Sequence, residues 1–201
     1  MIVAVALAIA VAQPNLSKLV LKPTQVGAGF VMQQRPDGHG TKQRTLDLCG
    51  TSNYPSEKLR TARLQVNYLE PTATYAVSNE VVTYKAGGAA QAMRELVQHA
   101  AHCPNKPIKA EGVTATFRIT RITDSKLLKG YLAVQIRTTG VVNGKRKTVT
   151  NYAVYQRVGN VLSGVYSYGA ATPAQELLCL HAAEASARNL RNGAGGGGIP
   201  A

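Results

Sequence analysis

A glycine pair, Gly87-Gly88, lies between a strand-like run and a helix-like run in residues 78–104, SNEVVTYKAGGAAQAMRELVQHAAHCP. That order is typical of phosphate-binding sites, in which a glycine-rich loop exposes backbone amides at a helix N-terminus. A P-loop also requires GxxxxGK[ST] and a dinucleotide-binding turn requires GxGxxG, and neither pattern is present. Lys85 precedes the glycines instead of following them. We therefore interpret Gly87-Gly88 as a tight reversal of the chain.

Histidine and cysteine side chains offer two further kinds of chemistry. His99, His102 and Cys103 are close enough in sequence to suggest a metal, but no C-x-x-C pattern or fourth ligand accompanies them. Cys179 and His181 resemble an activated thiol pair, but on a helix their side chains point in different directions. No G-x-S-x-G elbow exists, and acidic residues are few. We expect no enzymatic activity, no metal and no cofactor.

The charge of the chain points to anionic partners. Lys and Arg total 23 against 10 Asp and Glu, which gives a net charge of +13. Such a charge favours nucleic acid, anionic lipid heads or anionic wall polymers without choosing among them. The basic residues are dispersed, and no RNA-binding aromatic motif interleaves them, so we expect no specific nucleic acid recognition. A polyanion-binding protein that acts through net charge is the alternative function.

The first twelve residues, MIVAVALAIAVA, are apolar without interruption. As a helix they would extend about 18 Å, which is short of the ~30 Å hydrocarbon core of a bilayer. Their length fits the apolar region of a signal peptide, and residues 10–12 have the A-x-A form of a cleavage site. The outer end of a membrane anchor and a buried strand are the alternatives. We expect export to the cell envelope or beyond, with residues 13–40 as a linker and irregular arm.

Three cysteines allow one disulfide and leave one thiol. Cys49 ends a short strand-like run at residues 45–49, and Cys103 ends the best-defined helix, so their pairing would join those elements. Two other pairings are arithmetically possible. Cys179 lies among Ala and Leu, which predicts a buried small hydrophobic residue.

Two periodicities predict the elements. Residues 62–68 alternate between apolar and polar side chains, as do several later runs, and this is typical of half-exposed strands. Residues 89–102 carry one apolar stripe at helical spacing, and Thr172-Pro173 begins a second helix. Asn143-Gly144 is a strong hairpin signal. The predicted strands are residues 45–49, 62–68, 74–85, 112–123, 131–142, 148–158 and 161–169.

This order of elements indicates an α+β fold. Short hairpins exclude a wholly parallel sheet, and two amphipathic helices must bury their apolar stripes. We expect a twisted antiparallel sheet of about 5–7 strands with the two main helices packed on one face. A single domain would span residues 41–191, followed by a flexible glycine-rich tail at 192–201.

The sheet face away from the helices is the candidate ligand surface. Arginine and tyrosine side chains on a concave sheet combine charge with hydrogen bonding. An ordinary solvated face is the alternative. Strand alternation assigns three residues to this surface, and three more depending on register; the six are Arg118, Gln135 and Arg137, then Tyr152, Gln156 and Tyr166.

Three quoted stretches support a family resemblance: TLDLCG at residues 45–50, SEKLRTARLQV at 56–66, and the run 78–104. In their order and character they resemble the PknH-like extracellular sensor domains of actinobacteria, over roughly residues 40–190. The resemblance implies an antiparallel sheet with helices packed on it, a cleft for an unknown ligand, and no catalysis. It also implies a disulfide between Cys49 and Cys103.

The chain departs from that family in three respects. It lacks the second cysteine pair, the tryptophan before the helix cysteine, and any kinase motif. Together with the resemblance, the sequence predicts an exported, non-enzymatic, monomeric sensor-like domain. Its partner would be an unidentified small molecule or an anionic envelope ligand, with contact to a membrane surface or wall polymer.

Overall fold

A computed structural model describes residues 14–51, 53–72, 75–104, 106–110, 113–169 and 172–194. The apolar segment 1–12, with its predicted signal peptide, lies outside the described residues, as does the tail beyond Ala194. Within the described part, no helix is both long enough and apolar enough to cross a membrane.

Within these described ranges, eight strands form one sheet in the order β1-β2-β3-β8-β7-β6-β5-β4, and every neighbouring pair is antiparallel. The predicted antiparallel sheet is confirmed, but the predicted number of 5–7 strands is wrong. The strands that the sequence did not reveal are the short edges β1 and β4, which contain too few residues to show alternation. The strands are β1 (Val31–Gln34), β2 (Arg60–Leu69), β3 (Tyr75–Tyr84), β4 (Ile108–Ala110), β5 (Val113–Ile122), β6 (Leu132–Val142), β7 (Lys145–Val158) and β8 (Val161–Gly169).

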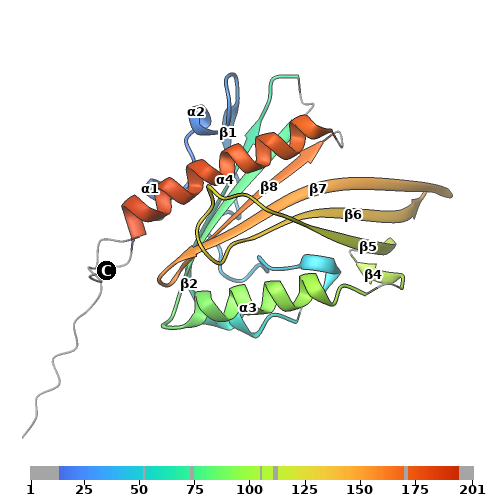
Figure 1. Cartoon of the computed structure of the whole chain (residues 1–201), viewed down its shortest axis with the longest axis horizontal. Coiled ribbons are helices and arrows are strands. Elements are labelled where there is room, and N and C mark those ends of the chain that lie inside the picture. The colour runs from blue at the N-terminus through green and yellow to red at the C-terminus, as the bar shows by residue number, and fades with distance from the viewer. Residues whose placement is uncertain are drawn as a thin grey trace, which may run out of the picture.

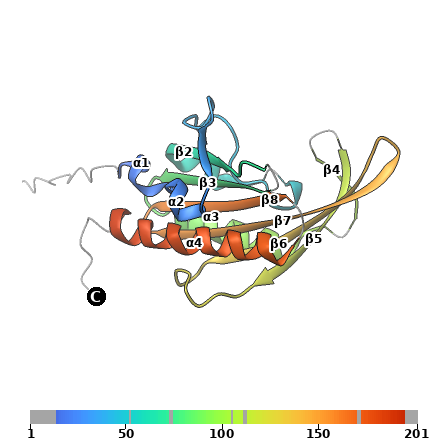
Figure 2. The same cartoon turned by 90° about the horizontal axis from the view of Figure 1, so that it is seen from above.

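The two long helices, α3 (Gly88–Ala101) and α4 (Pro173–Ala194), cover opposite faces of the sheet (Figure 1, Figure 2). The prediction that both pack on one face is therefore wrong. The central strands give the reason, since the consecutive β3 residues Val81 and Val82 are both buried and belong to different core clusters. Strands that are apolar on both faces require cover on both faces. We call the two sides the α3 face and the α4 face.

The segment expected to be a linker and irregular arm contains α1 (Leu16–Leu19), α2 (Pro23–Val26) and β1. Leu19 and Leu21 are almost fully buried in the core under α4. The amide of Leu21 donates to Asn79 Oδ1 on β3 at 2.9 Å, and β1 pairs with β2. These contacts make the described part of the segment, from residue 14 onward, a packed component of the domain.

Most of the local features predicted from the sequence are present in the structure, with one exception. Asn143 and Gly144 both have positive φ, at 52° and 71°, which confirms the predicted hairpin. Pro173 is the first residue of α4, as predicted, and Thr172 Oγ1 accepts a hydrogen bond from the amide of Gln175 at 3.3 Å. The exception is the predicted strand 45–49, which is wrong.

A 3₁₀ turn, η1 (Leu48–Gly50), takes the place of that strand, and Cys49 within it has a φ of 63°. Positive φ breaks the extended conformation that a strand needs. A second 3₁₀ turn, η2 (Pro55–Leu59), leads directly into β2.

Gly87-Gly88 forms a tight reversal into α3. Gly87 is the N-cap residue with a φ of 78°, and Gly88 lies so close to β3 that a Cβ there would be 2.8 Å from Tyr84 Cβ. Close backbone packing therefore accounts for the second glycine. The interpretation of this pair as a structural corner agrees with the structure.

Strands β5, β6 and β7 extend beyond both helices and form a twisted ribbon at one end of the molecule (Figure 1, Figure 2). Both faces of this ribbon are only partly covered. A hollow lies on each face of the described sheet, and these two hollows are the candidate sites.

Candidate functional site

A large hollow, which we call the sheet cavity, lies on the α3 face and has a volume of about 950 Å³. One wall is the segment that contains η1, including Asp47, Leu48 and Cys49. Its floor is formed by β2, β3 and β5 to β8, whose lining residues include Arg63, Gln65, Glu80, Phe117, Ile136, Thr138, Asn151, Tyr155, Tyr166 and Tyr168. The resemblance implied a cleft for an unknown ligand, and ligand binding in the sheet cavity remains a prediction.

Four tyrosines line the sheet cavity, and three of them, Tyr155, Tyr166 and Tyr168, lie on the α3 face of β7 and β8. Tyr155 on β7 is buried, and its ring meets the edge of Tyr166 on β8 with centroids 5.6 Å apart at 77°. Tyr168, two residues further along β8, is exposed. Burial raises the pKa of the Tyr155 and Tyr166 hydroxyls, so both are neutral at ordinary pH. The three rings offer an apolar surface with hydroxyl groups attached.

A buried ion pair lies in the floor of the sheet cavity. Arg63 on β2 donates through Nε to Glu80 Oε1 on β3, and both side chains are almost completely buried. Tyr166 donates to the other carboxylate oxygen of Glu80 at 3.3 Å. Burial raises the pKa of Glu80 to about 7, although the charge on Arg63 lowers it. Arg63 also donates to the carbonyl of Asp37 at 3.0 Å, so the arginine is held by contacts from distant parts of the chain.

The cavity wall is attached to α3 by the predicted disulfide. Cys49 and Cys103 are bonded, which confirms the pairing that the resemblance implied. Near the bond, the ring of Tyr54 lies against His99 of α3 with centroids 4.6 Å apart. Ser56 donates to Glu95 of α3 at 2.5 Å. These contacts hold the segment before β2 against the helix, and so they fix one wall of the cavity.

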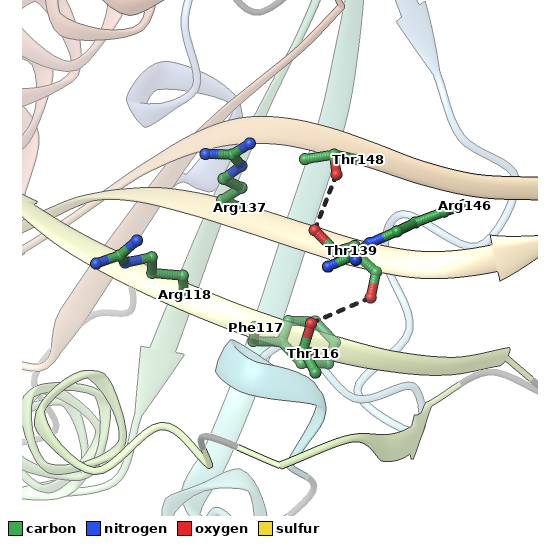
Figure 3. A pocket seen from close by; sticks show the side chains of 7 residues that line it. All are labelled: Thr116, Phe117, Arg118, Arg137, Thr139, Arg146 and Thr148. Carbon is green, nitrogen blue, oxygen red and sulfur yellow. Dashed lines mark hydrogen bonds between the residues drawn. The ribbon is translucent and has the colours of Figure 1, made fainter.

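A second hollow, which we call the arginine groove, lies across β5, β6 and β7 and has a volume of about 540 Å³ (Figure 3). It opens on the α4 face, because Arg137 alternates with the α3-face residue Ile136. Arg118 on β5 lies directly opposite Arg137 on β6. Figure 3 shows both side chains leaving their strands in the same direction. The lining residues are Thr116, Phe117, Arg118, Arg137, Thr139, Arg146 and Thr148.

The structure brings four of the six predicted ligand residues together. Arg118 and Arg137 are exposed on the α4 face, and Gln135 lies two residues before Arg137 on the same strand. Gln135 donates to the hydroxyl of Tyr152 at 3.1 Å, and Tyr152 is buried. A ligand-binding role for these residues remains a prediction.

The other two residues lie elsewhere. Gln156 is buried beneath α4, where its Nε2 donates to the carbonyl of Ala183 at 2.9 Å. Tyr166 pairs with Ala153, the neighbour of Tyr152, and therefore faces the sheet cavity on the opposite side. Strand alternation identifies the residues of one strand that share a face. It does not say whether that face lies on the same side of the sheet as a given face of another strand.

Sequence reasoning missed most of the sheet cavity. Arg63 was expected on the exposed side of its strand, and no pattern pointed to Glu80 as its partner. The only sign of this ion pair in the sequence is a basic residue in one strand and an acidic residue in the next. The antiparallel register is what brings the two into contact.

The remaining chemical candidates have structural roles. His99 and His102 each have a ring nitrogen within hydrogen-bonding distance of a backbone carbonyl, at 3.1 Å from Asn53 O and 2.9 Å from Gln98 O. The described residues contain no group of three His, Cys, Asp or Glu that could hold a metal. Cys179 is buried, as predicted, and burial raises the pKa of its thiol to about 12. A thiol with that pKa is not an activated nucleophile.

The chain is similar in fold to the extracellular domain of PknH from Mycobacterium tuberculosis. The alignment has a TM-score of 0.51 and 13% sequence identity, and it covers 88% of this chain and 98% of that chain. No family model and no curated protein match the sequence. At this identity the similarity to the PknH domain concerns the fold alone, and it agrees with the fold that the resemblance implied.

Proposed function

We propose that this chain is an exported, sensor-like domain that binds a small molecule in the sheet cavity and does not transform it. Two observations support this assignment. The fold is similar to the extracellular domain of PknH, and the domain contains a disulfide between Cys49 and Cys103. Disulfides of this kind persist mainly in oxidising compartments outside the cytosol.

The sheet cavity is the observation that carries the proposal. Its volume of about 950 Å³ lies near the upper end of the range of small-molecule sites. Tyrosine rings line it, and a few polar groups converge in its floor, which is the usual composition of such sites. The disulfide and the contacts of η2 hold its wall in place before binding, so little ordering entropy is lost when a ligand enters.

The lining indicates the chemistry of the ligand. Tyr155, Tyr166 and Tyr168 favour an apolar or aromatic body. Arg63 is already paired with Glu80 in the floor, so its charge is not available to a ligand. Lys109 and Lys147 are exposed and also line the cavity, which favours an anionic group at the mouth. We therefore infer an apolar ring system that bears one acidic group.

The dye 8-anilinonaphthalene-1-sulfonate has this chemistry and tests the proposal. We expect saturable binding of the dye to the folded chain. Thr138→Trp, which places a large ring inside the cavity, should abolish it. Thr120→Trp is the matched control, because Thr120 is exposed on the other face of β5.

Near-ultraviolet circular dichroism must show that each variant is folded, since partly folded chains also bind this dye. Equal binding by the wild type and Thr138→Trp would exclude the sheet cavity as the site. Native mass spectrometry is a second test and uses the chain purified from its secreting cells. We expect a small molecule that the wild type retains and Thr138→Trp lacks.

A further inference from the structure

Polar and positively charged residues occupy successive rows across β5, β6 and β7 on the α4 face. In one row, Arg118 lies opposite Arg137. In the next row, Thr116 lies opposite Thr139, and Thr139 lies opposite Thr148. Beyond them, Arg146 on β7 lies opposite Val141. Because every second residue of a strand points to the same side, these rows form one continuous surface.

The pairing of Arg118 with Arg137 conflicts with the usual rules of sheet stability. Like charges directly opposite each other on neighbouring strands destabilise the pair. Within the described parts of the chain, none of the three groove arginines forms an ion pair, and the residues lining the groove include no Asp or Glu. Repulsion between two paired arginines that no acidic residue of the domain offsets is expected at a site where a ligand supplies the opposite charge. Here that charge is negative.

The spacing along the strands indicates the shape of the ligand. Val141, opposite Arg146, is four residues beyond Arg137, a separation of about 13 Å along a strand. Between these two positive positions lies the row of threonines. Thr139 Oγ1 and Thr148 Oγ1 are 2.9 Å apart and hydrogen-bonded, and Thr116 donates to the carbonyl of Thr139 at 3.3 Å (Figure 3). A single small anion could reach only one end of this surface.

We propose that the arginine groove binds a linear polymer that carries phosphate groups. Guanidinium groups form paired hydrogen bonds with phosphate oxygens, which makes arginine the preferred residue for phosphate recognition. Arg118 and Arg137 together hold one phosphate, and Arg146 holds a phosphate further along the same chain. Exposed residues line the groove at both ends, so a polymer can pass through it. This site lies on the face opposite the sheet cavity and does not depend on a ligand there.

Inorganic polyphosphate is the test ligand, and two triple variants separate the groove from net charge. The first variant is Arg118→Gln, Arg137→Gln and Arg146→Gln. The matched control is Arg121→Gln, Arg188→Gln and Arg191→Gln, which removes the same three charges from exposed positions outside the groove. Isothermal titration calorimetry at several salt concentrations measures the affinities, and circular dichroism shows that each variant is folded.

We expect the groove variant to bind polyphosphate about tenfold more weakly, or worse, because charge-assisted hydrogen bonds are lost. The slope of log affinity against log salt should also fall by about two, since the loss of three phosphate contacts means that fewer counterions are released. The control variant should stay within about twofold of the wild type, because scattered surface charges contribute little each.

Several results would overturn the proposal. Equal weakening by both triple variants would mean that net charge alone binds the polymer. Orthophosphate binding as tightly as polyphosphate would identify a small-anion site instead of a polymer site. Tighter binding to phosphatidylglycerol vesicles than to polyphosphate, lost in the groove variant, would reassign the groove to a membrane surface. A wild-type chain that does not bind polyphosphate would also contradict the proposal.

Discussion

Cys49 forms a disulfide with Cys103, 54 residues further along the chain, and so attaches the wall of the sheet cavity to the end of α3. Closing a loop of this length contributes about 4 kcal/mol to the free energy of unfolding, because the bond restricts the conformations of the unfolded chain. We expect urea unfolding in reductant to show a loss of about that size. Cys103→Ser should show the same loss without reductant and no further change with it.

Cys179→Ala is the control for this prediction. Its thiol is free and buried, so the variant keeps the disulfide and should remain sensitive to reductant. Wild-type stability that does not change on reduction would contradict a stabilising role for the bond.

The buried carboxyl of Glu80 predicts a pH dependence of stability. Its pKa in the folded domain is about 7, above the ordinary value of 4.5, so the folded state retains the proton longer than the unfolded state. Protonated Glu80 therefore contributes up to about 3 kcal/mol to the free energy of unfolding below about pH 4.5. This contribution is lost as the pH rises to about 7.

Urea unfolding between pH 4.5 and pH 8 measures this dependence. Glu80→Gln cannot titrate, and its stability should therefore vary less across the same range, whatever its absolute value. Parallel curves for the wild type and the variant would show that another group is responsible.

Asn79 connects the N-terminal segment to the sheet. Its side chain accepts from the amide of Leu21 and donates to the carbonyl of Gly164 at 3.0 Å, and it is fully buried. Asn79→Ala leaves both backbone groups without that partner, so we expect a loss of about 3 kcal/mol in urea unfolding. Asn67→Ala, at a half-buried position on β2, should change stability by less than about 0.5 kcal/mol. Similar losses for both variants would exclude this account.

The two glycines at the start of α3 should respond differently to substitution. Gly88→Ala places a Cβ 2.8 Å from Tyr84 Cβ and 3.1 Å from Leu59 Cβ, and this overpacking should cost about 2 kcal/mol. Gly87→Ala meets no atom within 4 Å but has a φ of 78°, which should cost about 1 kcal/mol.

Asparagine tolerates positive φ better than alanine and therefore distinguishes the two causes. Gly87→Asn should recover most of the stability lost in Gly87→Ala, as measured by thermal unfolding. Gly88→Asn should be at least as unstable as Gly88→Ala. Recovery at both positions would mean that backbone conformation, and not packing against Tyr84, explains both glycines.

The candidate sites show where inference from sequence stops. The alternation of residues 112–123 and 131–142 placed Arg118 and Arg137 on one face, and the structure agrees. The same reasoning grouped Tyr166 with them, although Tyr166 lines the cavity on the other side. Within one strand the period of two is dictated by backbone geometry, whereas the relative faces of two strands depend on their pairing register.

The sequence by itself determined the features that depend on neighbouring residues. These are the start of α3 at its glycine pair, the Asn143-Gly144 hairpin, the cap of α4 and the antiparallel character of the sheet. Each depends on backbone dihedrals or on periodicity within a few residues, so local composition is sufficient.

Only the tertiary structure decided which face each helix covers, that the segment after residue 13 belongs to the core, and that Arg63 meets Glu80. These relationships join residues far apart in the chain, and their free energy comes from burying surfaces that no single segment can bury alone. The two hollows arise in the same way. A disulfide holds η1 beside the sheet, where η1 forms one wall of the sheet cavity. The register of β5 against β6 places Arg118 beside Arg137 in the arginine groove.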